Sequence, residues 1–209
     1  MELTGEIYNL IKNSIIDANK NKEYEFECVF SQNINRELFS DVLSYLNNSK
    51  SFKLFETLYR ESLDISLYNT NYRLTIDKQN DIVDYCNTGV LNEYTILEKK
   101  NIENFENIKL AEYDVYFKMK NEEEKDSLDN LEELMKVNNK HFRNKKRYSF
   151  MHQSKLFRVD LTIVKSSMYV SNKIEKSGVL KSPEKYEIEI EYLNNISDDI
   201  DNIIEILFN

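Results

Sequence analysis

Two segments of this chain alternate glutamate with hydrophobic residues, and this pattern constrains the fold more than any other feature of the sequence. The first segment is EYEFECVF at 23–30, and the second is YEIEIEY at 186–192. The side chains of a β-strand point alternately to its two faces, so each segment is predicted to be a strand with three glutamates on one face. Like charges at this spacing repel one another, and they are stable together only beside cations or basic groups.

Basic residues alternate with hydrophobic residues in the same way on other predicted strands, chiefly 142–150 and 156–164. A solvated sheet face is the commonest reason for such alternation, and it explains any one of these strands. It explains the set poorly, because solvated faces usually mix charges with Ser, Thr and Gln. The charged residues concerned are Arg73, Lys118, Lys120, Arg143, Lys145, Arg147, Arg158 and Asp160.

These strands predict a sheet that closes into a barrel with its charged face inward. The apolar outer face is then covered by amphipathic helices, expected near 3–20, around Leu38–Leu46 and near 196–209, the last with Ser197 as its cap. Further strands are expected at 62–68, 72–76, 94–100 and 112–120, a weak helical turn at 80–87, and an acidic surface helix or excursion at 121–139. The predicted fold class is α+β: an eight-stranded antiparallel barrel, with residues 1–209 forming one domain and both terminal helices as extensions.

Composition excludes several classes of active site. Three glycines allow neither a Walker A loop nor G-x-G-x-x-G, and the two histidines and two cysteines have no zinc-ligand spacing. Neither a Cys-x5-Arg nucleophile motif nor a nucleotidyl-lysine K-x-D-G motif occurs. The net charge of -9 disfavours general nucleic-acid binding. A polyanion would therefore have to bind at a local, enclosed basic site. No membrane span or signal peptide is expected, and the expected location is intracellular.

The charged interior indicates a site for a chain of phosphates. Carboxylate oxygens are the ligands that hard cations such as Mg²⁺ and Mn²⁺ take. Lys and Arg neutralise phosphoryl oxygens. Acidic strands facing basic strands across a tunnel would hold a metal ion and a polyphosphate side by side.

The same motifs resemble those of the triphosphate tunnel metalloenzymes. The pair EFE at 25–27 and the run EIEIE at 187–191 resemble the two glutamate motifs of that family. RNKKRYSF at 143–150 resembles its basic strand, and RVDLTIVKSS at 158–167 resembles the following R-x-D-x-T strand. The order of these motifs, from about residue 23 to 193, is most similar to the metal-dependent RNA 5′-triphosphatases of fungi, protozoa and large DNA viruses.

The resemblance implies roles for individual residues. It identifies Glu25, Glu27 and Glu191 as metal ligands, Glu189 as a group that orients water and Glu187 as the partner of a tunnel base. It implies that Arg73, Lys145 and Arg147 bind phosphate, and that Arg143 and Asp160 form an ion pair supported by Thr162. The remaining candidates are Arg158 on the same wall, Lys120, and Lys99 (or Lys100, if the register differs by one). They also include a water-positioning glutamate within 122–124, with Glu123 or Glu124 favoured, and Asp64 as an acid that bonds to metal-bound water.

The function implied by the resemblance is removal of the γ-phosphate from 5′-triphosphate RNA, the first step of mRNA cap formation, with Mg²⁺ or Mn²⁺ as cofactor. Nucleoside triphosphate hydrolysis with manganese is expected beside it. The expected partners are the 5′ end of nascent RNA, nucleoside triphosphates and a guanylyltransferase or other capping subunits. A viral protein would act in the virion or the host cytoplasm. Two alternatives remain: an inorganic tripolyphosphatase or nucleoside triphosphatase of the same fold, and a non-catalytic phosphate-binding scaffold of a capping complex.

Overall fold

The computed structural model describes residues 4–30, 34–54, 59–137, 139–194 and 199–208. Its strands are β1 (Tyr24–Phe30), β2 (Phe52–Leu54), β3 (Arg60–Leu67), β4 (Tyr72–Ile76), β5 (Thr95–Asn101), β6 (Ile108–Leu110), β7 (Val115–Lys125), β8 (Lys140–His152), β9 (Phe157–Ser166) and β10 (Lys185–Tyr192). Its α-helices are α1 (Gly5–Lys20), α2 (Arg36–Asn48), α3 (Gln79–Thr88), α4 (Leu131–Val137), α5 (Ile174–Ser177) and α6 (Ile200–Phe208).

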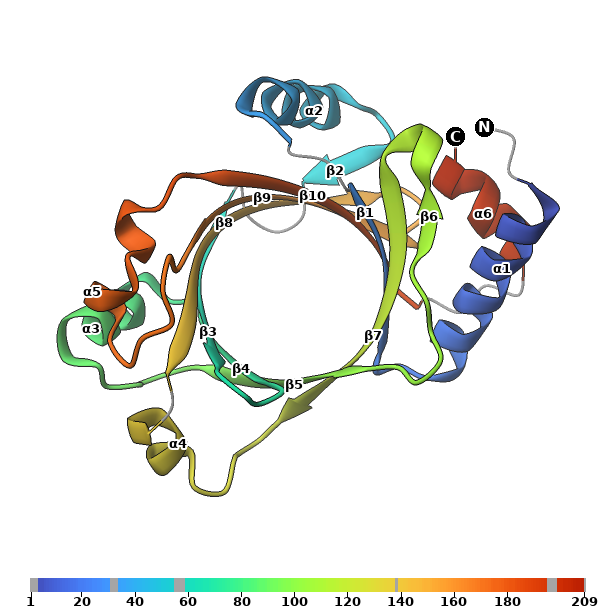
Figure 1. Cartoon of the computed structure of the whole chain (residues 1–209). Helices are drawn as coiled ribbons and strands as arrows, with labels where there is room; N and C mark the ends of the chain where they lie inside the picture. Colours follow the sequence, from blue (N-terminus) through green and yellow to red (C-terminus); the bar gives the residue numbers. More distant parts are fainter. Residues whose placement is uncertain (1–3, 31–33, 55–58, 138, 195–198, 209) are drawn as a thin grey trace.

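Eight of the strands form a closed antiparallel barrel. They follow the order β1-β10-β9-β8-β3-β4-β5-β7, and pairing of β7 with β1 closes the ring. Figure 1 looks along the barrel and shows the open ring of strands with the helices outside it. The two short strands lie outside this ring, where β2 pairs with β8 and β6 pairs with β7. The predicted eight-stranded barrel is therefore confirmed.

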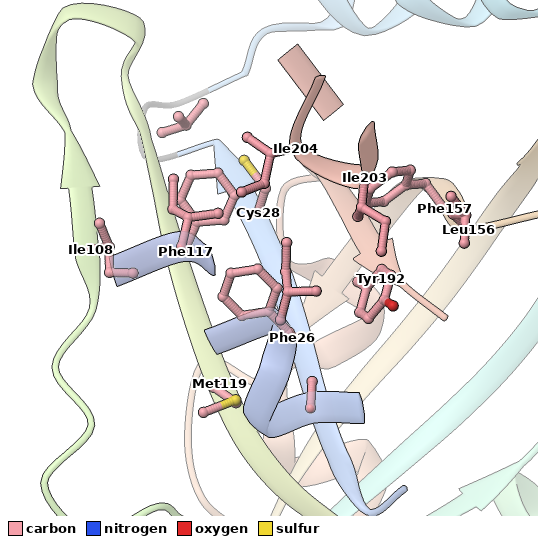
Figure 2. Packing of buried hydrophobic residues seen from close by; sticks show 14 of the residues in the cluster. Phe26, Cys28, Ile108, Phe117, Met119, Leu156, Phe157, Tyr192, Ile203 and Ile204 are labelled. Carbon is pink, nitrogen blue, oxygen red and sulfur yellow. The ribbon is translucent and has the colours of Figure 1, made fainter. Parts of the chain in front are cut away.

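Hydrophobic residues on the outer face of the barrel pack under the helices. Figure 2 shows the largest of these contacts, where α1 and α6 cover β1 and β7. Phe26 and Phe117 stack there with ring centroids 5.5 Å apart, and Ile203 of α6 is fully buried. Burying one such side chain contributes roughly 1.5–3 kcal/mol, so this outer layer holds the fold together while the inner face stays polar.

Side-chain caps mark the starts of the first two helices. Thr4 accepts a hydrogen bond from the amide of Ile7 at 3.5 Å at the start of α1, and Asn35 accepts one from Leu38 at 2.8 Å at the start of α2. Ser197, the expected cap of the last helix, lies outside the described residues. None of the helices in the described part of the chain combines the length and hydrophobicity that membrane crossing requires.

One predicted boundary was wrong. We expected a strand that ended at residue 120, followed by a surface helix or excursion at 121–139. Instead, β7 continues to Lys125 and pairs with β5 along the added residues. Only α4 and its flanking turns form the excursion. This correction matters for the site, because it turns the acidic run at 122–124 into part of the barrel wall.

Candidate active site in the barrel interior

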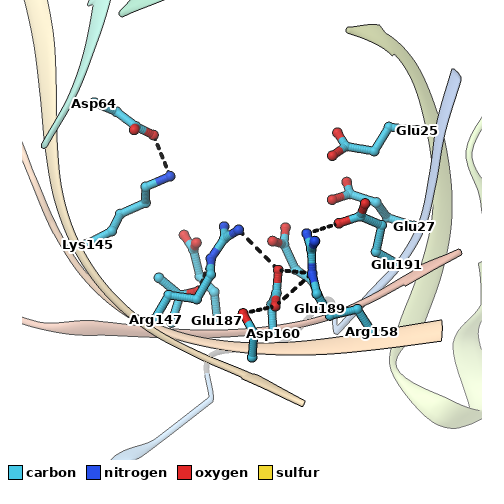
Figure 3. A network of polar contacts seen from close by, with 12 residues as sticks. Glu25, Glu27, Asp64, Lys145, Arg147, Arg158, Asp160, Glu187, Glu189 and Glu191 are labelled. Carbon is cyan, nitrogen blue, oxygen red and sulfur yellow. Dashed lines mark hydrogen bonds and ion pairs between the residues drawn. The ribbon is translucent and has the colours of Figure 1, made fainter. Parts of the chain in front are cut away.

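Three glutamates from two neighbouring strands meet inside the barrel. β1 supplies Glu25 and Glu27, β10 supplies Glu191, and Glu27 is the cross-strand partner of Glu191. One carboxylate oxygen from each residue lies within 4.8 Å of the others. Figure 3 shows the three side chains pointing toward one another from the barrel wall. The residues between them in sequence, such as Phe26, point outward into the core.

Burial and mutual repulsion act on these carboxylates. Burial raises the pKa of Glu27, and the neighbouring Glu25 and Glu189 raise it further. Burial also raises the pKa of Glu191 to about 8, although Arg158 opposes this shift. A divalent cation among the three oxygens would relieve both effects, and an all-carboxylate donor set suits Mg²⁺ or Mn²⁺. The three residues therefore fit the metal that the resemblance implies.

Lys118 was expected on the charged face, but the resemblance gave it no role in the site. Its ammonium lies 2.6 Å from a carboxylate oxygen of Glu27 and 3.3 Å from one of Glu189. Burial works against the ionised form of Glu189, but Lys118 and Arg147 outweigh it and lower the pKa of that carboxyl. The signal was present in the sequence, because Lys118 alternates with Phe117 and Met119.

A buried acid organises two bases on the opposite wall. Asp64 of β3 is fully buried, and its carboxylate lies 2.6 Å from the ammonium of Lys145 and 3.8 Å from Nε of Arg73. Thr75 donates a hydrogen bond to the other oxygen at 3.0 Å. Burial lowers the pKa of Lys145 to about 8, an effect that Asp64 partly offsets. Two of the predicted phosphate-binding bases are thus held by Asp64, from strands β4 and β8.

A second buried acid holds two arginines. Asp160 accepts hydrogen bonds from Nε of Arg158 at 3.1 and 3.2 Å and lies 3.1 Å from Nη1 of Arg147. Ser149 donates to the same carboxylate at 2.6 Å. Arg158 also pairs with Glu191, so this network connects the basic wall to the three glutamates (Figure 3). Thr162 accepts from Nε of Arg147 at 3.3 Å.

The predicted ion pair between Arg143 and Asp160 was wrong. In the register of β8 and β9, Asp160 faces Ser149, whereas Arg143 faces Ser166. Arg143 instead donates to both carboxylate oxygens of Glu187 at 2.7 Å. This contact gives Glu187 a tunnel base as its partner, as the resemblance implied.

The register of β5 and β7 settles which of the adjacent lysines and glutamates reach the interior. Lys99 is the cross-strand partner of Glu122, forms an ion pair with it, and lies 3.8 Å from a carboxylate oxygen of Glu25. Burial, together with the nearby Arg73, lowers the pKa of Lys99 to about 8. Lys100 forms an ion pair at 2.9 Å with Glu98. Both residues alternate with Lys99 along β5 and therefore lie on the outer face of the barrel. The choice of Lys99 over Lys100 is supported.

The expectation that Glu123 or Glu124 faces the site needs correction. Glu123 lies on the outer face of β7 and pairs with Lys125, and Glu124 is exposed at the end of the strand. The glutamate enclosed by the barrel is Glu122, which lies beside Lys99 and 3.7 Å from Nη2 of Arg73. The prediction failed because the strand was expected to end at residue 120, five residues before its observed end at Lys125.

Lys120 follows the inward alternation of β7. It is the partner of Glu25 across β1 and of Asn101 across β5, and its ammonium donates to the side chain of Asn101. No ion pair of Lys120 is found among the described residues.

The neighbouring thiol offers no alternative chemistry. Cys28 lies on the outer face of β1 within the hydrophobic core, and burial raises the pKa of its thiol to about 12. A thiolate nucleophile is not formed there at neutral pH. What the interior offers is a group of carboxylates beside a dense array of Lys and Arg, which suits binding and charge neutralisation of a polyphosphate.

No protein-family model and no curated protein sequence matches the chain. Among solved structures, the mimivirus capping enzyme triphosphatase in its triclinic form superposes with a TM-score of 0.75, at 25% identity over 99% of this chain and 96% of that chain. Its monoclinic form gives 0.73, at 23% identity over 100% and 97%. The S. pombe RNA triphosphatase gives 0.61, at 14% identity over 96% and 83%. The chain thus has the tunnel fold of these triphosphatases, as its motifs predicted.

Proposed function

We propose that this chain is a metal-dependent polynucleotide 5′-triphosphatase that removes the γ-phosphate from 5′-triphosphate RNA, the first step of mRNA cap formation. The observation that carries the proposal is the interior of the barrel, where Glu25, Glu27 and Glu191 converge and Lys and Arg side chains line the facing wall. Structures of the mimivirus capping enzyme triphosphatase and the S. pombe RNA triphosphatase share this fold over nearly the whole chain.

The chain's own side chains supply binding and charge neutralisation. Glu25, Glu27 and Glu191 would hold Mg²⁺ or Mn²⁺, and the bound ion would supply a positive charge on the phosphoryl oxygens. Lys145 and Arg147 point into the same space and would neutralise the other oxygens (Figure 3). Phosphoryl transfer passes through a transition state with charge on its equatorial oxygens, so positioning and charge stabilisation are sufficient for catalysis.

Glu122 is the carboxylate placed to orient the attacking water. It is held by Lys99 and Arg73 and is nearly enclosed, with 11% of its side chain exposed. One of its oxygens, Oε1, makes no hydrogen bond in the described structure, although it is in an ion pair with Lys99. In the proposed reaction Glu122 accepts a hydrogen bond from water in line with the bond that breaks.

The second candidate is a tripolyphosphatase or nucleoside triphosphatase of the same fold. It is favoured by the interior itself, because the Lys and Arg side chains there are of the kind that binds phosphate oxygens, which all three substrates carry. Hydrolysis of nucleoside triphosphates with manganese would therefore accompany the RNA activity. A non-catalytic scaffold is less favoured, because the acids and bases expected of the interior are present and most of them are in contact.

The test compares three substrates in the same assay. Phosphate release from γ-labelled triphosphate RNA, ATP and tripolyphosphate is measured with Mg²⁺, with Mn²⁺ and with chelator. The proposal predicts the highest kcat/KM for RNA and none of the three activities in chelator. Release from tripolyphosphate alone would assign the second function. If RNA is the substrate, the chain would act before a guanylyltransferase or with other capping subunits. The same proposal places it inside the cell or in the virion.

A further inference from the structure

The barrel opens into a cavity at each end. Because β1 and β10 are antiparallel, the start of β1 lies beside the end of β10, and the reverse holds at the other end. One cavity, of about 460 Å³, is lined by the start of β1 and the end of β10, and we call it the acidic mouth. The other, of about 570 Å³, is lined by the end of β1 and the start of β10, and we call it the aromatic mouth.

The two mouths differ in charge. The acidic mouth is lined by Glu23, Glu25, Glu122 and Glu191 against one lysine, Lys22. The aromatic mouth is lined by three glutamates and three basic residues. Glutamates are paired at both mouths. At the aromatic mouth, Glu187 accepts from Arg143 and Glu189 lies 3.3 Å from Lys118, and both bases line that mouth. At the acidic mouth, Glu122 pairs with Lys99 and Glu191 with Arg158, but neither base lines the mouth itself. A polyanion is repelled at the first mouth and tolerated at the second.

The mouths also differ in the apolar surface that they present to the tunnel. Val29 and Tyr116 are cross-strand partners on the inward face, one step beyond the pair of Glu27 and Lys118. They line the aromatic mouth together with Phe30, whose exposed fraction is 37%. At the acidic mouth Tyr192 is buried, and its hydroxyl donates to Asn19 at 2.7 Å. Tyr24 packs against the outer core there.

Resting on the proposed function, we infer that the 5′ end of RNA enters through the aromatic mouth, with its first nucleoside against Val29 and Tyr116. A base stacks readily on an aromatic ring without regard to its identity. The phosphates then pass Lys118 and Arg143 and reach the three glutamates near the opposite end. The substrate therefore has one orientation in the tunnel, and the acidic mouth does not admit RNA.

Matched charge reversals at the two mouths test this orientation. Lys185→Glu changes an exposed lysine of the aromatic mouth, and Lys22→Glu changes an exposed lysine of the acidic mouth. Binding of a 3′-labelled, 5′-triphosphate RNA is measured by fluorescence anisotropy in chelator, and KM is measured with Mn²⁺. Lys185→Glu is expected to raise both the dissociation constant and KM about tenfold, because it replaces a positive charge near the phosphates by a negative one at a hydrated site. Lys22→Glu is expected to change them less than about twofold.

A second pair of variants tests the stacking surface. Tyr116→Ala is expected to raise KM for RNA and ATP about tenfold relative to KM for tripolyphosphate, which has no base. Tyr116→Phe keeps the ring and should restore most of the difference. Thermal unfolding of each variant verifies that the barrel is intact.

The possible failures are distinguishable. If the wild type releases no phosphate from RNA, the proposed function fails and the orientation falls with it. If the wild type is active and Lys22→Glu weakens RNA binding as much as or more than Lys185→Glu, only the orientation is overturned. It is also overturned if Tyr116→Ala raises KM for all three substrates equally.

Discussion

Replacing Asp64 by Asn should destabilise the protein by an amount that depends on pH, because the main partner of this buried carboxylate is a lysine that can lose its proton. The carboxylate of Asp64 lies 2.6 Å from the ammonium of Lys145, and Asp64 is fully buried. Breaking a buried ion pair by removing one partner costs about 3–5 kcal/mol when the other partner must stay charged. Lys145 can instead lose its proton and become neutral, since burial already lowers its pKa to about 8.

The sign of the pH dependence follows from proton binding. The pKa of Lys145 is lower in the folded protein than in the unfolded chain, so stability rises with pH wherever the unfolded chain binds the extra proton. Without Asp64 the folded pKa falls further, and a loss of about 3 kcal/mol corresponds to about two pKa units. The variant therefore begins to gain stability at a lower pH than the wild type does. The cost of the substitution is largest near pH 6 and falls by about 1.4 kcal/mol per pH unit up to about pH 8.

Urea unfolding at pH 6, 7, 8 and 9, in chelator, measures this dependence. Asp160→Asn is the matched control, because Asp160 is also buried but its charged partners are Arg147 and Arg158. Arginine keeps its proton in proteins, so the cost of Asp160→Asn should be constant across the same range. A constant cost for Asp64→Asn, or parallel curves for the two variants, would refute the claim that Lys145 depends on Asp64 for its charge.

Three further predictions concern the metal, the basic wall and the outer core. Phosphate release should fall by orders of magnitude in each of Glu25→Ala, Glu27→Ala and Glu191→Ala. Mn²⁺ should raise the thermal midpoint of the wild type, and it should raise that of Glu189→Gln by less. A wild-type midpoint that does not change with Mn²⁺ would contradict the metal site. Arg147→Lys should lower kcat/KM, since the point charge of a lysine does not reproduce the two-pronged contact of a guanidinium with phosphate oxygens. Lys145→Ala should lower kcat. An effect on KM alone would mean that Lys145 only binds the ground state. Phe26→Ala should cost about 3–5 kcal/mol in urea unfolding and leave the metal dependence of activity unchanged.

Much of the barrel could be predicted because its strands are apolar on one face and charged on the other. The segment at 186–192, expected to be a strand, is observed as β10 (Lys185–Tyr192), and the strands expected at 62–68 and 72–76 are observed as β3 and β4. The short strands Phe52–Leu54 and Ile108–Leu110 were not predicted. A strand of only three residues is too short to show alternation in the sequence. Both of these strands lie outside the eight-stranded ring, where β2 pairs with β8 and β6 pairs with β7.

The end of β7 was missed for a different physical reason. From Glu122 to Lys125 both faces of the strand carry charge, because Glu122 points inward to Lys99 while Glu123 points outward to Lys125. Alternation between apolar and polar residues therefore disappears, although the strand continues. Only the pairing with β5 distinguishes this segment from a solvated run.

The contacts inside the barrel depend on register, which sequence patterns determine to within a residue or two at best. Arg143 and Asp160 were both correctly placed on inward faces, but the pairing of Ser149 with Asp160 separates them along β8. The central role of Asp64 was underestimated for a related reason. Its two bases come from β4 and β8, and only the order of strands in the barrel brings them together.

The most direct test of the central claim follows the released phosphate and the remaining RNA end in the same reaction. RNA labelled at its γ-phosphate and, separately, at its α-phosphate is incubated with the wild type and with Glu27→Ala, with Mn²⁺ and with chelator. The structure predicts release of the γ-label as orthophosphate, retention of the α-label on diphosphate-ended RNA, and neither change in chelator or with Glu27→Ala. Equal release in chelator, or equal release by Glu27→Ala, would contradict the assignment of the three glutamates as a metal site of an RNA 5′-triphosphatase.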